Sequence, residues 1–161
     1  MSNTTPDAIF ASLEAMLVAL TPSGGTAVGD KSGYALIDEV GYVEDSETTA
    51  ASEMDRQIQL HPMTVQGLDL EGLTTTNATE GQFDLVIGHT MGDYRKARDR
   101  MMKDVQQIIA QMIHPTTTTA IDGVMRIWFD ASGYEMVRDG TFFWTTLRFG
   151  IEYASAADYG G

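Results

Sequence analysis

The sequence predicts an α+β fold, a two-layer sandwich in which a mainly antiparallel sheet carries two helices on one face. Two segments, 5–20 and 93–113, repeat their apolar residues at the spacing of an amphipathic helix. Three others, 82–89, 121–131 and 141–153, alternate apolar and polar residues, which is typical of strands with one buried face. The length of 161 residues fits a single domain, 1–161, and we find no internal repeat.

Composition limits the classes of function. With 43% hydrophobic and 20% charged residues the chain can bury a core, and no apolar run is long enough to span a bilayer. The absence of cysteine excludes disulfides, thiolate metal sites and cysteine nucleophiles. The first residues lack the pattern of a secretory signal, so we expect none. A net charge of −13 disfavours binding to nucleic acid or membranes, but it suits a wall past which DNA slides.

The first element is a helix over 5–20. Thr5 can act as its N-cap, Pro6 fits the first helical position, and Asp7 favours the positive end of the helix dipole. The Pro- and Gly-containing segment 21–25 ends the helix. One face carries the apolar stripe that we expect to be buried, namely Ile9, Leu13, Met16, Leu17 and Leu20.

The segment 21–53 is a variable insertion or loop region. Its glycines interrupt it early, and 34–37 and 40–43 are candidates for short strands. The run 44–53 is acidic and rich in turn-forming residues, so we expect an exposed loop. Two interpretations stay open for Glu44, Asp45 and Glu47: an ordinary solvated loop, or the lining of a lumen.

The middle of the chain predicts strand, loop, strand and helix. Residues 56–60 alternate and form a short strand, whereas the Thr-rich part of 62–80, residues 74–79, is assigned to a loop or irregular edge. After the strand 82–89, Asp93 N-caps the second helix, and 116–119 forms a linker. The buried stripe of that helix is Tyr94, Ala97, Met101, Val105, Ile108 and Met112.

The final two strands form a hairpin or lie side by side. Asp139-Gly140 is a two-residue turn signal, and Ser132-Gly133 predicts a bulge or kink. Residues 155–161 form a C-terminal tail. On the last strand Phe143, Thr145, Leu147, Phe149, Ile151 and Tyr153 share the core face.

The opposite face of the last strand carries Trp144, Arg148 and Glu152. An aromatic residue there is either an anchor for a neighbouring subunit or part of a second small core. Both interpretations stay open at this point. Either way, at least one aromatic of the run 142–144 lies outside the main core, because neighbouring residues of a strand point to opposite faces.

No sequence motif indicates catalysis, a cofactor or a metal. His61, His89 and His114 have no metal-ligand spacing, so we interpret them as structural. The glycines match neither a dinucleotide fingerprint nor a phosphate loop. Neighbouring carboxylates are expected by chance at this net charge. We therefore expect no enzyme, no cofactor and no metal; a small α+β ligand-binding domain or enzyme is the alternative from another class.

Five of the ten basic residues lie close together on the second helix: Arg95, Lys96, Arg98, Arg100 and Lys103. A solvated helix face is one interpretation of this cluster. A docking face for an acidic neighbouring subunit is the other, since a complementary patch would favour self-assembly of so acidic a chain. We select Arg95, Lys96, Arg98 and Arg100 as candidates for subunit or tube contacts, together with Trp144, Arg148 and Glu152 on the sheet.

The order of elements over 54–154 resembles the tail terminator (tail completion) proteins of long-tailed bacteriophages. The resemblance is sharpest in Ala131-Ser132-Gly133-Tyr134, the charged stretch 135–140, and the alternating strand 144–153 that ends in an aromatic. The unit 83–113 lies at the expected distance upstream, and the helix 6–20 matches the opening helix of the family. The segment 21–53 departs from the family pattern, which leaves its role open.

The resemblance implies an architectural function. Such proteins form a hexameric ring that caps the tail tube, stops its polymerisation and joins it to the head-neck connector. DNA then passes through the lumen without sequence recognition. The implied location is the tail-neck junction of the virion, after synthesis in the host bacterial cytoplasm. A tail tube subunit or another neck adaptor is the alternative within phage architecture, because these proteins also form rings.

Overall fold

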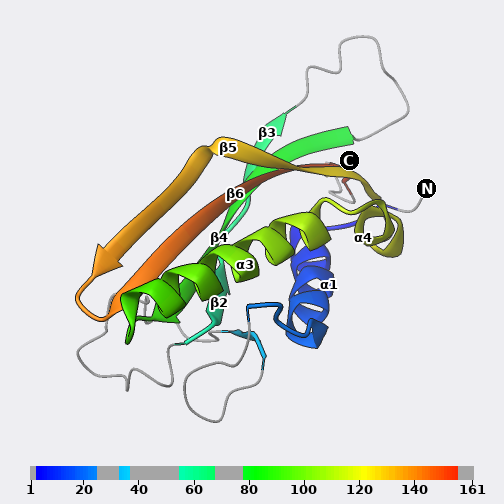
Figure 1. Cartoon of the computed structure of the whole chain (residues 1–161). Helices are drawn as coiled ribbons and strands as arrows, with labels where there is room; N and C mark the ends of the chain where they lie inside the picture. The colour runs from blue at the N-terminus through cyan, green and yellow to red at the C-terminus, as the bar shows by residue number, and fades with distance from the viewer. Residues whose placement is uncertain (1–2, 25–32, 37–54, 68–77, 156–161) are drawn as a thin grey trace.

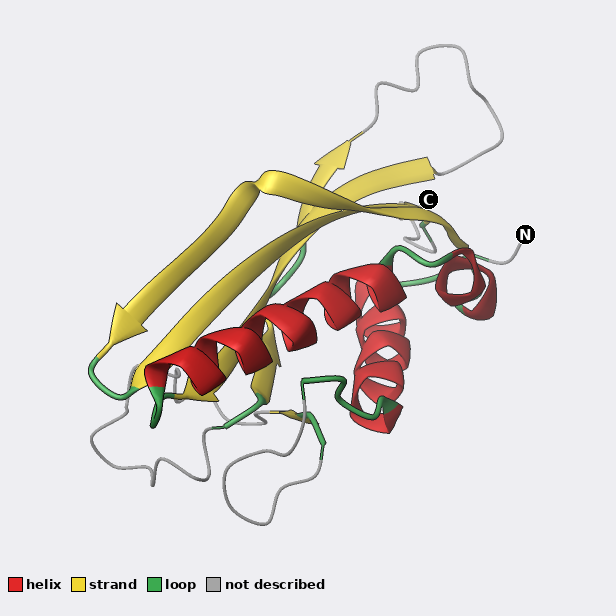
Figure 2. Cartoon of the chain, viewed as in Figure 1, coloured by secondary structure: helices red, strands yellow, loops and turns green. Residues whose placement is uncertain are grey.

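The computed structural model describes residues 3–24, 33–36, 55–67 and 78–155. Its described part has two layers (Figures 1 and 2): a sheet, and the helices α1 (Pro6–Ala19) and α3 (Tyr94–Met112) packed against one of its faces. A short helix, α4 (Pro115–Ala120), follows α3. The α+β class and the two-layer arrangement predicted from the sequence are confirmed.

The sheet is mixed but mainly antiparallel. Within the described residues its strand order is β1-β2-β4-β6-β5, and β3 pairs with β4 off this path. Among the described strands β1 and β2 pair in parallel, and an isolated parallel bridge joins Thr4 to Ser155. The strands are β1 (Ala35–Leu36), β2 (Gln57–Leu60), β3 (Thr64–Gly67), β4 (Ala78–Thr90), β5 (Val124–Asp139) and β6 (Phe142–Ala154). The long central pair β4–β6 organises the sheet, and β5 forms one of its edges.

The core lies between the helices and one face of the sheet. All six predicted core residues of the last strand are buried there. Ile9, Leu13 and Leu17 of α1 are fully buried, whereas Met16 and Leu20 are partly buried against them. The stripe of α3 is buried except Tyr94, which is 51% exposed. Its ring lies on the first turn of the helix, 6.0 Å from the ring of Phe143.

Both helices begin where the sequence predicts. The Asp93 carboxylate accepts hydrogen bonds from the backbone N–H of Arg95 (3.0 Å) and Lys96 (3.3 Å), so it caps α3. Thr5 occupies the N-cap position of α1, but its side chain makes no capping hydrogen bond. Pro6 at the first helical position has no N–H that needs a partner, which removes one of the unsatisfied donors there.

The hairpin of β5 and β6 is confirmed, with a correction to its turn. The two loop residues are Gly140 and Thr141 rather than Asp139 and Gly140, because Asp139 pairs with Phe142. Gly140 takes a φ of 54°, a conformation that glycine adopts without steric cost. The tight turn therefore follows from the glycine, one residue later than the sequence signal indicated.

The predicted bulge is present between Asp130 and Glu135, where the β5–β6 register shifts. The Asp130 carboxylate accepts hydrogen bonds from the backbone N–H (3.0 Å) and the hydroxyl (2.6 Å) of Ser132. These bonds lower the pKa of the Asp130 carboxyl. A Cβ at Gly133 would overlap the side chain of Arg148, so this position needs glycine. The bulge bends β5 and redirects its second half.

One local prediction was wrong. Residues 116–119 are not a linker, because they continue from Pro115 into α4, where His114 Nδ1 accepts a hydrogen bond from Thr116 N at 3.2 Å. No strand was predicted from the sequence at β3, which pairs with Gly81 and its neighbours. The candidate strand 34–37 is present in part as β1, and the strand predicted at 56–60 is β2, preceded by Arg56 with a φ of 60°. The predictions for 40–43, the acidic run 44–53 and most of the tail 155–161 lie outside the described residues.

Candidate functional site

The basic residues predicted as a cluster on α3 differ in their exposure and in their contacts. Arg95 and Lys96 are exposed on α3, and Arg98 is exposed while its guanidinium contacts the Asp99 carboxylate at 2.8 Å. Arg100 points inward, with only 13% of its side chain exposed. It donates hydrogen bonds to the Asp55 carboxylate and the Thr90 carbonyl, both at 2.9 Å. Within the chain Arg100 thus joins the residue Asp55, just before β2, to the end of β4, and its role in subunit or tube contacts stays a prediction.

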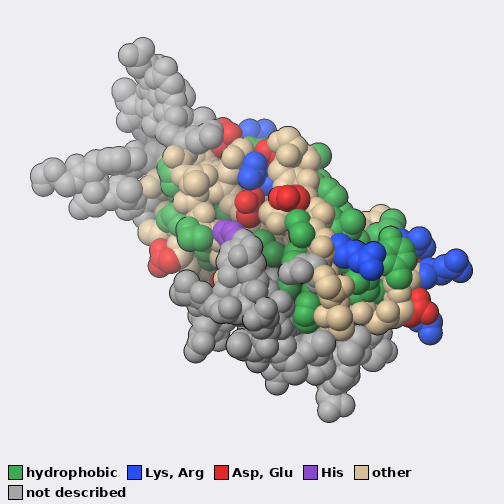
Figure 3. Space-filling view, turned by 90° about the vertical axis from the view of Figure 1, so that its left-hand side faces the viewer, with side chains coloured by type: hydrophobic (Ala, Val, Ile, Leu, Met, Phe, Trp, Pro, Cys, Tyr) green, Lys and Arg blue, Asp and Glu red, His purple; other side chains and the backbone are tan. Residues whose placement is uncertain are grey.

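Other cations remain without an ion pair inside the described part of the chain. They are Arg95, Lys96 and Lys103 on α3 and Arg138 near the end of β5. Arg138 instead stacks over the exposed ring of Tyr94, 5.6 Å from its centre. In Figure 3, Lys and Arg side chains lie at the right of the described surface together with acidic and hydrophobic ones. Acidic residues accompany these cations in the sequence, Asp93 and Asp99 at α3 and Glu135 and Asp139 on β5.

An apolar groove of about 460 Å³ lies between α3 and β5, and none of its lining residues is charged. It is formed by α3 together with Tyr134 of β5, and we call it the α3–β5 groove. From α3 its lining residues are Met102, Val105, Gln106, Ile109, Ala110 and Ile113. Met102 is 57% exposed and Tyr134 is 45% exposed, so the groove leaves large apolar side chains in contact with water.

The bulge in β5 accounts for one wall of the groove. Met136 pairs with Thr145 and Arg138 with Phe143, so both lie on the face of β5 that α3 packs against. Met136 is nevertheless 47% exposed. The helix layer thus does not cover the second half of β5, which extends past α3 along an open edge of the sheet (Figure 1).

The other predicted interface residues lie on the sheet face opposite the helices, where each has a partner within the chain. Trp144 is buried, stacks on Phe142 with ring centres 5.5 Å apart, and passes over Gly88. The Arg148 guanidinium binds the Asp84 carboxylate at 3.0 Å. Glu152 accepts a hydrogen bond from Arg126 at 3.1 Å. Of the two interpretations of Trp144, the geometry favours the second small cluster.

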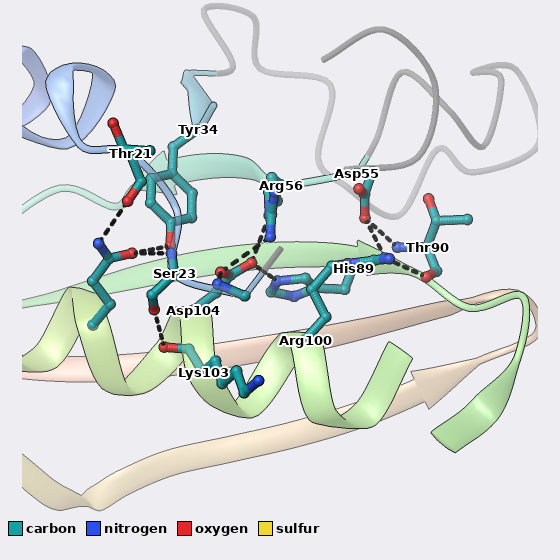
Figure 4. A network of polar contacts seen from close by, with 12 residues as sticks. Thr21, Ser23, Tyr34, Asp55, Arg56, His89, Thr90, Arg100, Lys103 and Asp104 are labelled. Atoms are coloured by element: carbon teal, nitrogen blue, oxygen red, sulfur yellow. Dashed lines mark hydrogen bonds and ion pairs between the residues drawn. The ribbon is translucent and has the colours of Figure 1, made fainter. Parts of the chain in front are cut away.

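A buried polar network, not predicted from the sequence, surrounds Asp104 of α3 (Figure 4). Its carboxylate accepts hydrogen bonds from Arg56 Nε at 2.6 Å and Nη2 at 3.2 Å, and from the backbone N–H of Gly24 at 3.0 Å. His89 Nε2 lies 2.9 Å away from it and completes the set. Asp104, Arg56 and His89 are all fully buried.

The electrostatics of the network follow from this geometry. Burial favours the neutral form of Asp104, but the hydrogen bonds and charges of His89 and Arg56 outweigh it and lower the pKa of the carboxyl. The neighbouring Tyr34 hydroxyl donates to Gln107 Oε1 at 2.9 Å. Burial and the negative charge of Asp104 both raise the pKa of Tyr34. The network is therefore an ionised Asp beside a neutral Tyr.

Its location indicates a structural role. The three central side chains come from β4, the residue before β2, and α3, and Gly24 adds the segment after α1. The Asp104 carboxylate is fully buried, and its contacts join these elements to one another. The available signal in the sequence was Asp104 itself, an acidic residue within the apolar stripe between Met101 and Val105.

The remaining candidates are two histidines, possible metal ligands and the acidic residues of 44–47. His61 contacts the side chain of Gln59 at 3.2 Å, and His114 caps α4. Among the described residues, no group of three or more His, Asp or Glu side chains is arranged to hold a metal ion. The acidic residues Glu44, Asp45 and Glu47 lie outside the described ranges.

None of the helices in the described part of the chain has the length and hydrophobicity needed to cross a membrane. Comparison with known proteins gives no family for the chain: no protein-family model matches it, and no curated protein matches its sequence.

Proposed function

We propose that this protein is a tail terminator of a long-tailed bacteriophage. In this function it assembles into a homo-hexameric ring that caps the tail tube and joins it to the head-neck connector. One observation carries the proposal: the α3–β5 groove, an apolar surface that leaves large side chains such as Met102 and Tyr134 about half exposed. Such a surface is typical of a subunit interface.

The charge balance supports passage of DNA through the ring. The chain has 23 acidic and 10 basic residues, so most of its surface repels phosphate. A lumen with this character keeps DNA from adhering while it moves. The basic residues on α3 would face a neighbouring protein rather than the DNA. The expected partners are therefore other copies, the tail tube protein and the connector, at the tail-neck junction of the virion.

A tail tube subunit is the second candidate, because the open edge of β5 and the groove would also serve assembly into a tube. The two functions differ in how assembly ends. A tube subunit stacks ring on ring without limit, whereas a terminator forms a single ring and stops. This difference decides the experiment.

The first experiment measures mass in solution by light scattering over a range of protein and salt concentrations. We expect a closed species with the mass of a hexamer and no longer polymers. The protein is then added to polymerising tail tube protein of the same phage, and tube lengths are measured by electron microscopy. Shorter tubes with a ring at one end support the terminator. Open polymers of the protein alone support the tube subunit, and a monomer that leaves tube length unchanged contradicts both.

A further inference from the structure

We infer that two stretches of the chain, Thr21–Gly24 after α1 and Tyr34–Leu36 around β1, form a strap that opens away from α3 while the rest of the sheet stays folded. In the closed position the strap lies on the buried Asp104 network, as Figure 4 shows for Ser23 and Tyr34. The inference concerns a motion within one copy of the chain, so it goes beyond the proposed ring and does not depend on it.

One side chain of α3 holds both stretches of the strap. Gln107 Oε1 accepts hydrogen bonds from Ser23 N at 3.0 Å and from the Tyr34 hydroxyl at 2.9 Å. Its amide nitrogen donates to the Thr21 carbonyl at 2.8 Å. Because one amide group binds both stretches, loss of its contact to one stretch weakens its hold on the other. The two stretches are therefore coupled through α3.

Gly24 allows the strap to lie directly on α3. Its N–H donates to Asp104 Oδ1 at 3.0 Å. A Cβ at Gly24 would overlap this carboxylate and the carbonyl oxygen of Arg100, so no side chain fits there while the strap is closed. The closed position thus depends on a contact that one added methyl group would disrupt.

Little apolar surface holds the strap in place. Among its described residues Tyr34 alone is buried. The pairing of β1 with β2 covers two positions at the end of the strand order, whereas the ladder between β4 and β6 follows both strands throughout. Segments with few buried apolar contacts open locally at a lower free energy than the core. The strap should therefore open before the central strands separate.

The groups beneath the strap also favour opening. Arg56 Nη1 and His89 Nδ1 are buried and have no hydrogen-bond partner in the described part of the chain. Arg56 has a φ of 60°, which is strained for a residue with a side chain. Burying a charged pair gains little net free energy, so returning Asp104 and Arg56 to water costs little. Opening thus converts a dry charged cluster into one that solvent reaches.

Hydrogen exchange of the full-length protein, followed by NMR, tests the inference. The reporters are three strap amides whose acceptors differ. If the strap opens as a unit, a single perturbation accelerates all three, while the amides of the β4–β6 ladder keep their rates. The reporters are Ser23 N–H, bonded to Gln107, Gly24 N–H, bonded to Asp104, and Ala35 N–H, bonded to the Arg56 carbonyl at 3.1 Å.

The first pair of variants is Gln107→Ala and its control Gln106→Ala. Gln107→Ala removes three hydrogen bonds to the strap, whereas Gln106 is an exposed neighbour of the same type. A hydrogen bond is worth roughly a factor of 2–12 in an equilibrium constant, so Gln107→Ala should accelerate exchange at Gly24 and Ala35 at least about tenfold. Neither amide is bonded to Gln107, so this change reports opening of the strap. Gln106→Ala should leave the rates unchanged.

The second pair approaches the strap from its own side. Gly24→Ala places a methyl group against Asp104, whereas a Cβ at Gly33 meets no atom within 4 Å. We expect Gly24→Ala to accelerate exchange at Ala35 several-fold and Gly33→Ala to leave it unchanged. Circular dichroism verifies that all variants are folded. If Gln107→Ala does not fold, Tyr34→Phe removes one of its three hydrogen bonds and keeps the buried ring.

The outcomes decide between a strap and two other behaviours. Acceleration of all three strap amides, with constant rates along β4 and β6, supports the inference. If exchange accelerates only at the amide that lost its acceptor, the contacts break one at a time and the strap is refuted. If the β4 and β6 amides accelerate by the same factor, the motion is global unfolding, and the inference fails. All variants are compared at one protein concentration, so the result is separate from that of the ring experiment.

Discussion

Replacing Asp104 with asparagine tests the buried ion pair between Asp104 and Arg56. The change keeps the shape of the side chain but removes the charge that balances a fully buried guanidinium. One oxygen of the new amide can still accept from Gly24 N and Arg56 Nη2. The amide nitrogen then replaces the oxygen that now lies 2.6 Å from Arg56 Nε, so two donors face each other. His89 can adapt by exchanging its ring proton, but Arg56 cannot.

The magnitude follows from these contacts. Loss of one hydrogen bond to a charged group costs about 1.5–3 kcal/mol. A buried charge left without its partner raises the total to about 3–5 kcal/mol. For a chain of this length each kcal/mol shifts the melting temperature by about 2–4 °C, so we expect a decrease of roughly 10 °C. A loss of about 3–5 kcal/mol is a large part of the free energy of unfolding of an ordinary domain.

The assay is urea unfolding followed by circular dichroism, with Asp99→Asn as the matched control. Asp99 lies on the same helix and pairs with Arg98, but 53% of its side chain is exposed. We expect this control to cost less than about 1 kcal/mol. Adding Arg56→Met to Asp104→Asn should recover part of the loss, because the unpaired guanidinium is gone. Equal unfolding free energies for Asp104→Asn and Asp99→Asn would refute the account of the network.

Acid titration, Gly133→Ala and Gly88→Ala test the Asp104 network, the β5 bulge and the packing of Trp144, respectively. The pKa of Asp104 is lower in the folded than in the unfolded chain. The ionised carboxylate therefore contributes its full stabilisation of the fold above about pH 4, and this stabilisation is lost as the pH falls through the pKa of the folded state. Melting temperatures should decline in acid more steeply for the natural protein than for Asp104→Asn. Gly133→Ala places a methyl group against the Arg148 side chain and should cost about 1–3 kcal/mol in urea unfolding, and it should also weaken self-association because Tyr134 moves. Gly88→Ala should displace the Trp144 ring and shift its fluorescence to longer wavelength.

One control serves both glycine substitutions. A Cβ at Gly92 meets no atom within 4 Å, so Gly92→Ala should leave stability, association and fluorescence close to those of the natural protein. Fluorescence is best recorded in a Trp128→Phe background, since the chain has two tryptophans. Unchanged emission in Gly88→Ala would contradict the close packing of Trp144 on β4. A Gly133→Ala protein as stable as Gly92→Ala would contradict the account of the bulge.

The sequence predicted those parts of the fold that depend on local periodicity. Spacing alone identified the buried stripe of α3 and the alternating face of β6. It missed β3, because that strand is defined by its pairing with β4 and has little pattern of its own. It also missed α4, whose signal was Pro115 at the first helical position rather than its run of threonines.

The site was harder to predict than the fold. A run of charges in the sequence does not say which face of a helix each side chain takes, so Arg100 was grouped with Arg95 although it points to Asp55. The network around Asp104 joins residues that are far apart in the chain. The α3–β5 groove depends on how far the bent edge strand β5 extends beyond α3. The spacing of apolar residues in the sequence does not give this relative position.

The long ladder between β4 and β6 has a consequence for how the protein folds. Its pairs run from Thr90 with Phe142 to Ala78 with Ala154, so α3, α4 and β5 all lie in the loop that the ladder closes. The β5–β6 hairpin, joined by two residues, closes a far shorter loop and can form within about 1–10 μs. Because longer loops cost more entropy to close, β4 should join a preformed hairpin, and that docking step sets the folding rate.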